Sequence, residues 1–180
     1  ENPFAIFPEV EEAYKKILDK KRKNAAEKKA LQAKWEKDNP ELAAKFKSFV
    51  EGGIPEIDFA AMEQKAGAAT RGASGSVLAN MAGVVENLIV ASADLSNSDK
   101  TDGYLNKTKA FTNGDFSGSF LQAGVCELTM ASIANGMALH GGVIPVIGTF
   151  FVFSDYMKPA ARMAALMQLP VKYVWTHDAF

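Results

Sequence analysis

The sequence predicts an α/β protein, in which a parallel sheet is covered by helices and preceded by charged linker helices. After residue 66, strand-like apolar runs alternate with helical segments, in the order strand, helix, strand, helix, strand. This alternation is typical of parallel strands joined by crossover helices. Residues 1–66 are instead charged and lysine-rich. We therefore expect a helical linker segment over 1–66 and the N-terminal part of an α/β domain over 67–180.

Two helices are expected in the linker segment. Pro8 is followed by a cluster of acidic residues, and both features suit the first turn of a helix. Residues 39–41, Asn-Pro-Glu, predict a second helix start, and the Gly52-Gly53 pair predicts its end. The eight lysines and arginines within residues 15–29 could bind nucleic acid. Interleaved acidic residues favour a solvated helix face instead, so we expect no nucleic-acid partner.

The α/β region is expected to hold three helices, three strands and one long polar loop. In order, these are a helix from about residue 74, a strand within 87–95, the loop over 97–119, a helix over about 125–139, a strand within 141–150, a helix over 153–169 and a strand over 170–177. Ligands of parallel sheets bind beyond the carboxyl ends of the strands. The ends of interest are therefore Ala93-Asp94, Gly148-Thr149 and Thr176-His177.

Composition limits the classes of function. The net charge is −1, and no apolar stretch reaches the roughly 20 residues of a membrane span, so we expect no membrane partner. The single cysteine, Cys126, fits a reducing compartment, and we expect a cytoplasmic protein. No Cys/His cluster has zinc-binding spacing, so no metal ligands are expected in this chain. The absent initial Met and the strand-like ending indicate a piece of something longer.

Glu127 is the main candidate for chemistry. It opens a helix whose residues are small or apolar on nearly every side. Such a helix is buried, so the carboxylate must be paired, hydrogen-bonded or protonated. An acid in that position is suited to bonding a ring nitrogen of a ligand. The alternative is a first-turn glutamate that only complements the helix dipole, a contribution on the order of 0.3–1 kcal/mol.

An aromatic set follows the second predicted strand. Phe150, Phe153 and Tyr156 recur every third residue, which brings them together on a helical turn. They form either a ligand pocket or a stripe of core residues, and the spacing alone leaves both open.

Polar candidates stand beside the glycines and the strand ends. Arg71 lies in ATRGASG, just before a helix, where it could hold a phosphate; a surface turn is the alternative. Asp94 and Ser98 follow a strand, and Asp94 is alternatively a helix cap or turn acid. His177 stands at a strand end, the favoured place for a site, although a lone histidine is usually structural.

Five segments together resemble the transketolase family. They are ATRGASG, SADLSNS, GVCELTMASIANGMALHGG, GTFFVFSDYMKPAARMAALM and VWTHDAF, in the family's order and at its spacing. The resemblance is strong over residues 55–180, and residues 1–54 are similar to the family's charged connecting helices. It implies a fragment spanning the linker and the first half of the pyrimidine-binding domain.

The resemblance implies a thiamine diphosphate enzyme that transfers a two-carbon ketol unit between sugar phosphates, in the pentose phosphate pathway. Glu127 matches the glutamate that bonds the cofactor's aminopyrimidine ring and favours its imino form. Phe150, Phe153 and Tyr156 match the aromatic pocket around that ring. Asp94 matches the aspartate at the cofactor and donor site.

The resemblance also implies partners. Arg71 and Ser98 match residues that bind the sugar phosphate, and His177 matches a substrate-binding histidine that we count with Glu127 as catalytic. In the family, the active site lies between two subunits of a homodimer, and the site for Mg²⁺ or Ca²⁺ lies outside the region that this chain matches. We therefore expect the fragment alone to be inactive.

The neighbours of Glu127 depart from the family's pattern. The family usually has Arg-Glu-His where this chain has Cys126-Glu127-Leu128. The acid is kept, and its local hydrogen bonding is put in doubt. Two alternatives stay open: another thiamine diphosphate enzyme, such as a deoxyxylulose-phosphate synthase or a keto-acid dehydrogenase subunit, and a catalytically silent binding module.

Overall fold

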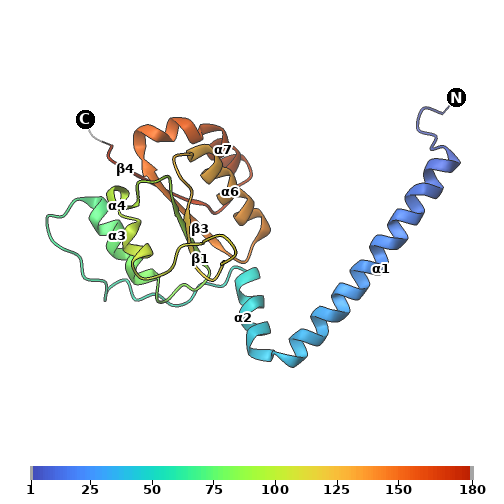
Figure 1. Cartoon of the computed structure of the whole chain (residues 1–180), viewed down its shortest axis with the longest axis horizontal. Helices are drawn as coiled ribbons and strands as arrows, with labels where there is room; N and C mark the ends of the chain where they lie inside the picture. The colour runs from blue at the N-terminus through green and yellow to red at the C-terminus, as the bar shows by residue number, and fades with distance from the viewer. Residues whose placement is uncertain (1, 179–180) are drawn as a thin grey trace. The chain divides into compact units, whose positions relative to one another are not determined.

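The computed structural model of the chain describes residues 2–178, in two compact units divided between Lys47 and Ser48 (Figure 1). The first unit contains α1 (Pro8–Asp38) and the start of α2 (Pro40–Val50), so both helices expected in the linker segment are present. Between them, the Asn39 side-chain amide donates to the Trp35 carbonyl over 2.9 Å. No helix within residues 2–178 is long and apolar enough to cross a membrane.

The second unit is built on a four-stranded parallel sheet with the strand order β2-β1-β3-β4. The strands are β1 (Leu88–Ser92), β2 (Phe120–Gln122), β3 (Ile144–Phe150) and β4 (Lys172–Thr176). All pairings are parallel, so the carboxyl ends of the strands meet at one edge. The predicted parallel sheet is confirmed, and the helices below complete the predicted fold class.

Helices cover both faces of this sheet (Figure 1). One side carries α3 (Thr70–Met81), α4 (Ser96–Asp99) and α5 (Asp102–Leu105), and the other carries α6 (Glu127–His140) and α7 (Ser154–Leu166). Successive strand residues face opposite sides and so feed two separate cores. These are, on the α3 side, Leu78, Val85, Leu88, Val90, Tyr104, Phe120 and Val146, and, on the α6 side, Ala91, Ala93, Met130, Ala131, Ala134, Ile147, Met157 and Ala160.

A buried amide ties the α6 side together. The Asn135 side chain of α6 donates to the Ala160 carbonyl of α7 over 2.8 Å and accepts from the Tyr173 hydroxyl of β4 over 3.1 Å. Burial raises the pKa of Tyr173, because the charged phenolate would lose solvation there. This three-way contact fixes α6 and α7 relative to the last strand, whose end carries a candidate site residue.

The structure corrects the expected long loop. Residues 97–119 are not a structureless loop, because they hold most of α4 and all of α5, and the short strand β2 that follows was not predicted. The segment also contains two buried polar residues, Asp99 and Thr101, and the Thr101 hydroxyl donates a hydrogen bond to the Asp99 carboxylate. The single buried aromatic of α5, Tyr104, donates to the Leu88 carbonyl over 2.7 Å and anchors the segment to β1.

The start of α3 is also corrected. The helix begins at Thr70, so Arg71 lies in its first turn and not just before it. Glycines usually weaken a helix, but here they allow close packing. A Cβ on Gly75 would stand 2.8 Å from the Lys100 carbonyl oxygen, and one on Gly103 would stand 2.4 Å from the Gly75 carbonyl oxygen. Tertiary packing against α5 therefore overrides the local glycine propensity.

Candidate functional site

The candidate residues gather at the carboxyl edge of the sheet. Asp94 follows β1, Phe150 ends β3, His177 follows β4, and Glu127 is the first residue of α6. This is the edge at which parallel α/β sheets bind ligands.

Two of these residues have an unusual backbone. Asp94 has φ of 64° and His177 has φ of 55°, both in the left-handed region. Non-glycine residues occupy that region uncommonly, and such conformations cluster at functional sites. Each stands within two residues of the end of its strand.

The aromatic residues form one continuous stack. The rings of Phe150 and Phe153 lie 5.6 Å apart at 10°, and those of Phe153 and Tyr156 lie 6.0 Å apart at 23°. The His177 ring joins the row, 4.0 Å from Phe150. Tyr156 is 63% exposed, so this row is not part of either core and offers a flat surface to a ligand.

Glu127 is a buried residue whose carboxylate has no partner within the described residues. Only 6% of the Glu127 surface is exposed to solvent. Within residues 2–178, its carboxylate makes no hydrogen bond or ion pair with a side chain or with the backbone. The helix start supplies a favourable positive field, and the carboxylate oxygens, which are not among the fully buried unpartnered atoms, remain accessible to a hydrogen-bond donor. A ligand that presents an N–H group at this edge would supply that donor.

The loop after β1 is held by a buried carboxylate that the sequence reasoning missed. Asp99 is 1% exposed and accepts from the Ser92 hydroxyl at 2.7 Å and from the Thr101 amide and hydroxyl at 2.9 and 2.7 Å. These bonds fix the segment that carries Asp94 and Ser98. A buried acid in a polar loop has no periodic signal in the sequence, because the loop around it is polar throughout.

Two threonines lie at strand ends that the sequence marked as of interest, although neither was predicted as a site residue. Thr149, in β3, is fully buried, and its hydroxyl has no partner within the described residues. Thr176, which ends β4, lies 2.9 Å through its hydroxyl from Nδ1 of His177. The available signal was a hydroxyl residue in an otherwise apolar run, immediately before a candidate site residue.

Arg71 and Ser98 stand apart from the aromatic row. Arg71 is exposed on α3 and makes no ion pair in the part of the chain that is described. Ser98 is half-buried on α4, and its hydroxyl donates to the Asn97 side chain over 3.2 Å. Within residues 2–178, no hydrogen bond, ion pair or ring contact joins either residue to Glu127 or to the aromatic row.

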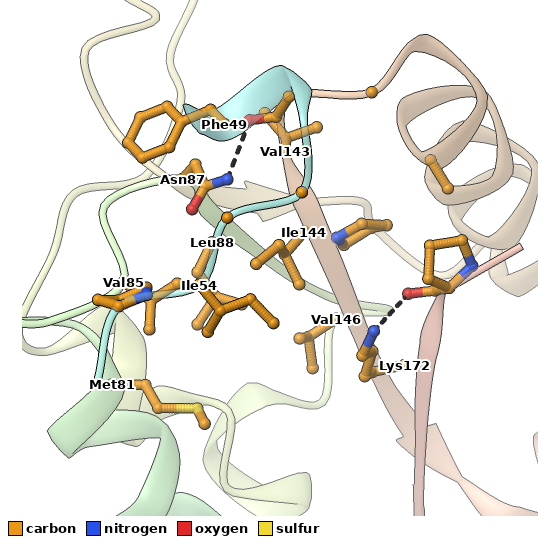
Figure 2. Close-up of a pocket in the computed structure, with 18 of the residues that line it drawn as sticks. Phe49, Ile54, Met81, Val85, Asn87, Leu88, Val143, Ile144, Val146 and Lys172 are labelled. Atoms are coloured by element: carbon orange, nitrogen blue, oxygen red, sulfur yellow. Dashed lines mark hydrogen bonds between the residues drawn. The ribbon is translucent and has the colours of Figure 1, made fainter. Parts of the chain in front are cut away.

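A separate apolar cavity lies at the opposite edge of the sheet. It has a volume of about 660 Å³, and the amino ends of β1, β3 and β4 contribute Leu88, Ile144 and Lys172 to its wall (Figure 2). Figure 2 shows the Asn87 amide, which donates to the Gly142 carbonyl over 3.1 Å. Its mostly apolar lining does not suit a phosphorylated ligand.

No cluster of three or more metal-ligating side chains occurs within residues 2–178. The described residues therefore offer hydrogen-bonding and stacking groups at the carboxyl edge of the sheet and no preformed cation site.

Comparisons with known proteins show the family to which this chain belongs. The family model "Transketolase, pyrimidine binding domain" matches residues 66–180. The transketolase of Halalkalibacterium halodurans is 44% identical over 99% of this chain and 27% of its own length. The transketolase of Geobacillus stearothermophilus is 45% identical over 82% of this chain and 22% of its own length. This chain therefore spans about a quarter of the length of the curated relatives it matches.

Solved structures extend the similarity to three dimensions. Transketolase from Leishmania mexicana superposes with a TM-score of 0.89 at 30% identity, covering 99% of this chain and 27% of that one. A Pichia stipitis transketolase in complex with sedoheptulose-7-phosphate superposes with a TM-score of 0.85 at 32% identity. The match covers 98% of this chain and 27% of that one. The resemblance drawn from the five sequence segments is thereby confirmed, and the chain belongs to the transketolase pyrimidine-binding domain family.

Proposed function

We propose that this chain supplies the aminopyrimidine pocket and part of the sugar-phosphate site of a transketolase, which transfers a two-carbon ketol unit between sugar phosphates. The observation that carries the proposal is that the carboxylate of the buried residue Glu127 has no partner within residues 2–178 and lies at the same edge of the sheet as a row of stacked rings. Relatives named transketolase support it, including Pichia stipitis structures titled as complexes with xylulose-5-phosphate and fructose-6-phosphate.

The groups at the carboxyl edge suit the aminopyrimidine ring of thiamine diphosphate. Such a ring has a flat face for the aromatic row and a nitrogen that can carry a proton toward Glu127. When bound, thiamine diphosphate supplies the carbanion chemistry of ketol transfer. Glu127 accepts a charge-assisted hydrogen bond from the ring and so favours its protonated tautomer. Phe150, Phe153 and Tyr156 orient the ring and exclude water from its face.

The substrate is held by the polar groups at the same edge. Arg71 binds a phosphate through its guanidinium, and Ser98 adds a hydroxyl. Asp94 lies at the junction of cofactor and donor, and His177 bonds an oxygen of the sugar. The left-handed backbone at Asp94 and His177 supports these two assignments, because strain of this kind accompanies functional positions.

The remainder of the active site lies outside this chain in the proposal. A second subunit of a homodimer provides the diphosphate site with its Mg²⁺ or Ca²⁺, and the complete enzyme works in the cytoplasm, in the pentose phosphate pathway. Residues 1–66 serve as the helical linker segment, and residues 67–180 are the N-terminal part of the pyrimidine-binding domain. The 180-residue chain alone is then inactive.

The test is the substitution Glu127→Gln in the complete protein. We expect thiamine diphosphate binding, followed by spectroscopic titration, to weaken and ketol transfer from xylulose 5-phosphate to ribose 5-phosphate to fall roughly 100-fold. Asp155→Asn is the matched control, because Asp155 is an exposed acid in the first turn of the neighbouring helix α7. It should leave both measurements within about twofold of the unsubstituted protein.

The same assays separate the alternatives. If Glu127→Gln leaves both binding and transfer unchanged, the proposed role of Glu127 is wrong. Cofactor binding without transfer to ribose 5-phosphate would indicate another thiamine diphosphate enzyme. Absence of cofactor binding by the complete protein would indicate a silent binding module.

A further inference from the structure

The His177 side chain is fixed on two sides by its neighbours. Nδ1 lies 2.9 Å from the hydroxyl of Thr176, and one face of the ring lies against Phe150, with a centroid distance of 4.0 Å and a tilt of 38°. Phe150 and Thr176 are themselves register partners in the β3–β4 pair. The backbone of His177 has a left-handed φ of 55°. Of the two ring nitrogens, Nε2 alone has no partner within the described residues.

The direction of the Thr176–His177 hydrogen bond follows from burial. Thr176 is 6% exposed, and its hydroxyl has no other partner among the described residues. If Nδ1–H donated to the hydroxyl oxygen, the buried O–H of Thr176 would be left without an acceptor, which is unfavourable. If the Thr176 hydroxyl donates to Nδ1 of His177, its O–H group is satisfied and only the lone pairs of its oxygen remain without a partner. A neutral imidazole that accepts at Nδ1 carries its proton at Nε2.

We propose that Thr176 is a positioning residue that holds neutral His177 as the Nε2–H tautomer, aimed to donate a hydrogen bond to an oxygen of a bound sugar phosphate. The substrate part of this inference rests on the proposed function, whereas the tautomer part rests on the geometry alone. An Nε2–H donor selects ligands that present a carbonyl, hydroxyl or phosphate oxygen and rejects those that present only a donor. Thr176 thereby acts on the substrate through His177.

The tautomer is tested by nitrogen NMR of the chain with labelled histidines at about pH 8.5, where an imidazole is neutral. The chain has two histidines, and His140→Gln assigns the signals of each. We expect unsubstituted His177 to show a protonated Nε2 and an Nδ1 shifted by an accepted hydrogen bond. Thr176→Ser should keep this signature, and Thr176→Val should shift it toward that of a free neutral histidine, in which both tautomers are populated.

The decisive outcomes do not depend on any one variant. A protonated Nδ1 in the unsubstituted chain would overturn the inference, even if Thr176→Val failed to fold. The inference would also be wrong if a folded Thr176→Val chain kept the unsubstituted signature.

The proposed hydrogen bond from His177 to the substrate is tested in the complete protein. We expect Thr176→Val to raise the KM for xylulose 5-phosphate about fivefold to tenfold, the effect of one neutral hydrogen bond, while thiamine diphosphate binding stays unchanged. Thr176→Ser should restore KM to within about twofold. An unchanged KM in Thr176→Val would overturn the substrate part. If the unsubstituted protein transferred no ketol unit, the proposed function would fail, while the NMR result would still decide the tautomer.

Discussion

The Ser92 hydroxyl donates a 2.7 Å hydrogen bond to the buried carboxylate of Asp99, which joins the end of β1 to the loop that carries Asp94 and Ser98. Asp99 also accepts two bonds from Thr101, at 2.9 and 2.7 Å. The loop is therefore rigid because one carboxylate satisfies three donors.

Removing that carboxylate should destabilise the second unit. Asp99→Ala leaves three buried donors unpaired, and we expect the free energy of unfolding to fall by about 3 kcal/mol. Asp99→Asn keeps an acceptor oxygen and should lose only about 1 kcal/mol. Urea unfolding, followed through Trp175 fluorescence in a Trp35→Phe background, measures both.

The control for Asp99 is Asp102→Ala in the next turn of the same segment. Asp102 is not fully buried, and its side chain makes no hydrogen bond in the described part of the chain. The substitution should change the free energy of unfolding by no more than about 0.5 kcal/mol. Equal losses for Asp99→Ala and Asp102→Ala would contradict the role given to the network.

Two glycines should respond to alanine in opposite directions. A Cβ on Gly148 of β3 would lie 2.6 Å from Cγ2 of Thr101 and 3.0 Å from Oδ2 of Asp99, so Gly148→Ala should destabilise the protein by about 2 kcal/mol. A Cβ on Gly136 of α6 would meet nothing within 4 Å. Gly136→Ala should stabilise the protein by about 0.5–1 kcal/mol, since alanine favours a helix interior. The same urea titration compares them, and a loss at Gly136 equal to that at Gly148 would refute the packing explanation.

Much of the second unit could be predicted because its signals are periodic or positional. The strands β1, β3 and β4 are apolar runs, and at short intervals α6 precedes β3 and α7 follows it. The carboxyl edge of the sheet then follows from parallel topology, and it gathers Asp94, Phe150 and His177 as expected.

The remainder depends on contacts between distant segments. The strand β2 has three residues, too few for a pattern, and it exists because Phe120 pairs with Val90. The helix α3 starts early because Gly75 and Gly103 let two backbones approach. Hydrogen bonds such as the one from Thr176 to His177 depend on side-chain placement, which no sequence spacing encodes.

The stacked aromatic row gives a prediction with a control in the same turn. The Phe153 ring stacks on both Phe150 and Tyr156, so Phe153→Ala should break the row and weaken thiamine diphosphate binding by the complete protein about tenfold. Phe151 instead packs against Trp175, with a centroid distance of 5.9 Å. Phe151→Ala should leave binding within about twofold. Equal weakening in the two variants, measured by spectroscopic titration, would show that the row is not the binding surface.

An exposed carboxyl gives the pH prediction. The ammonium group of Lys109 bonds Asp115 and, with hydrogen bonds from the Ser117 hydroxyl and amide, lowers the pKa of this carboxyl to about 2. A lowered pKa means that the folded turn favours the carboxylate. The resulting stabilisation is present above the unfolded value of 3.8 and is lost as the pH falls through about 2.

Carbon NMR of the Asp115 carboxyl should therefore show a titration midpoint near 2, below the ordinary value of 3.8. Lys109→Met removes the largest cause and should move the midpoint upward, while Ser117→Ala should move it less, because its amide bond remains. The stabilisation is small and screened by solvent, so salt should raise the midpoint in the unsubstituted chain more than in Lys109→Met. A midpoint near 3.8 in the unsubstituted chain would contradict the assigned bonds. If Lys109→Met left the midpoint unchanged, the lowered pKa of Asp115 would be due to Ser117 and not to Lys109.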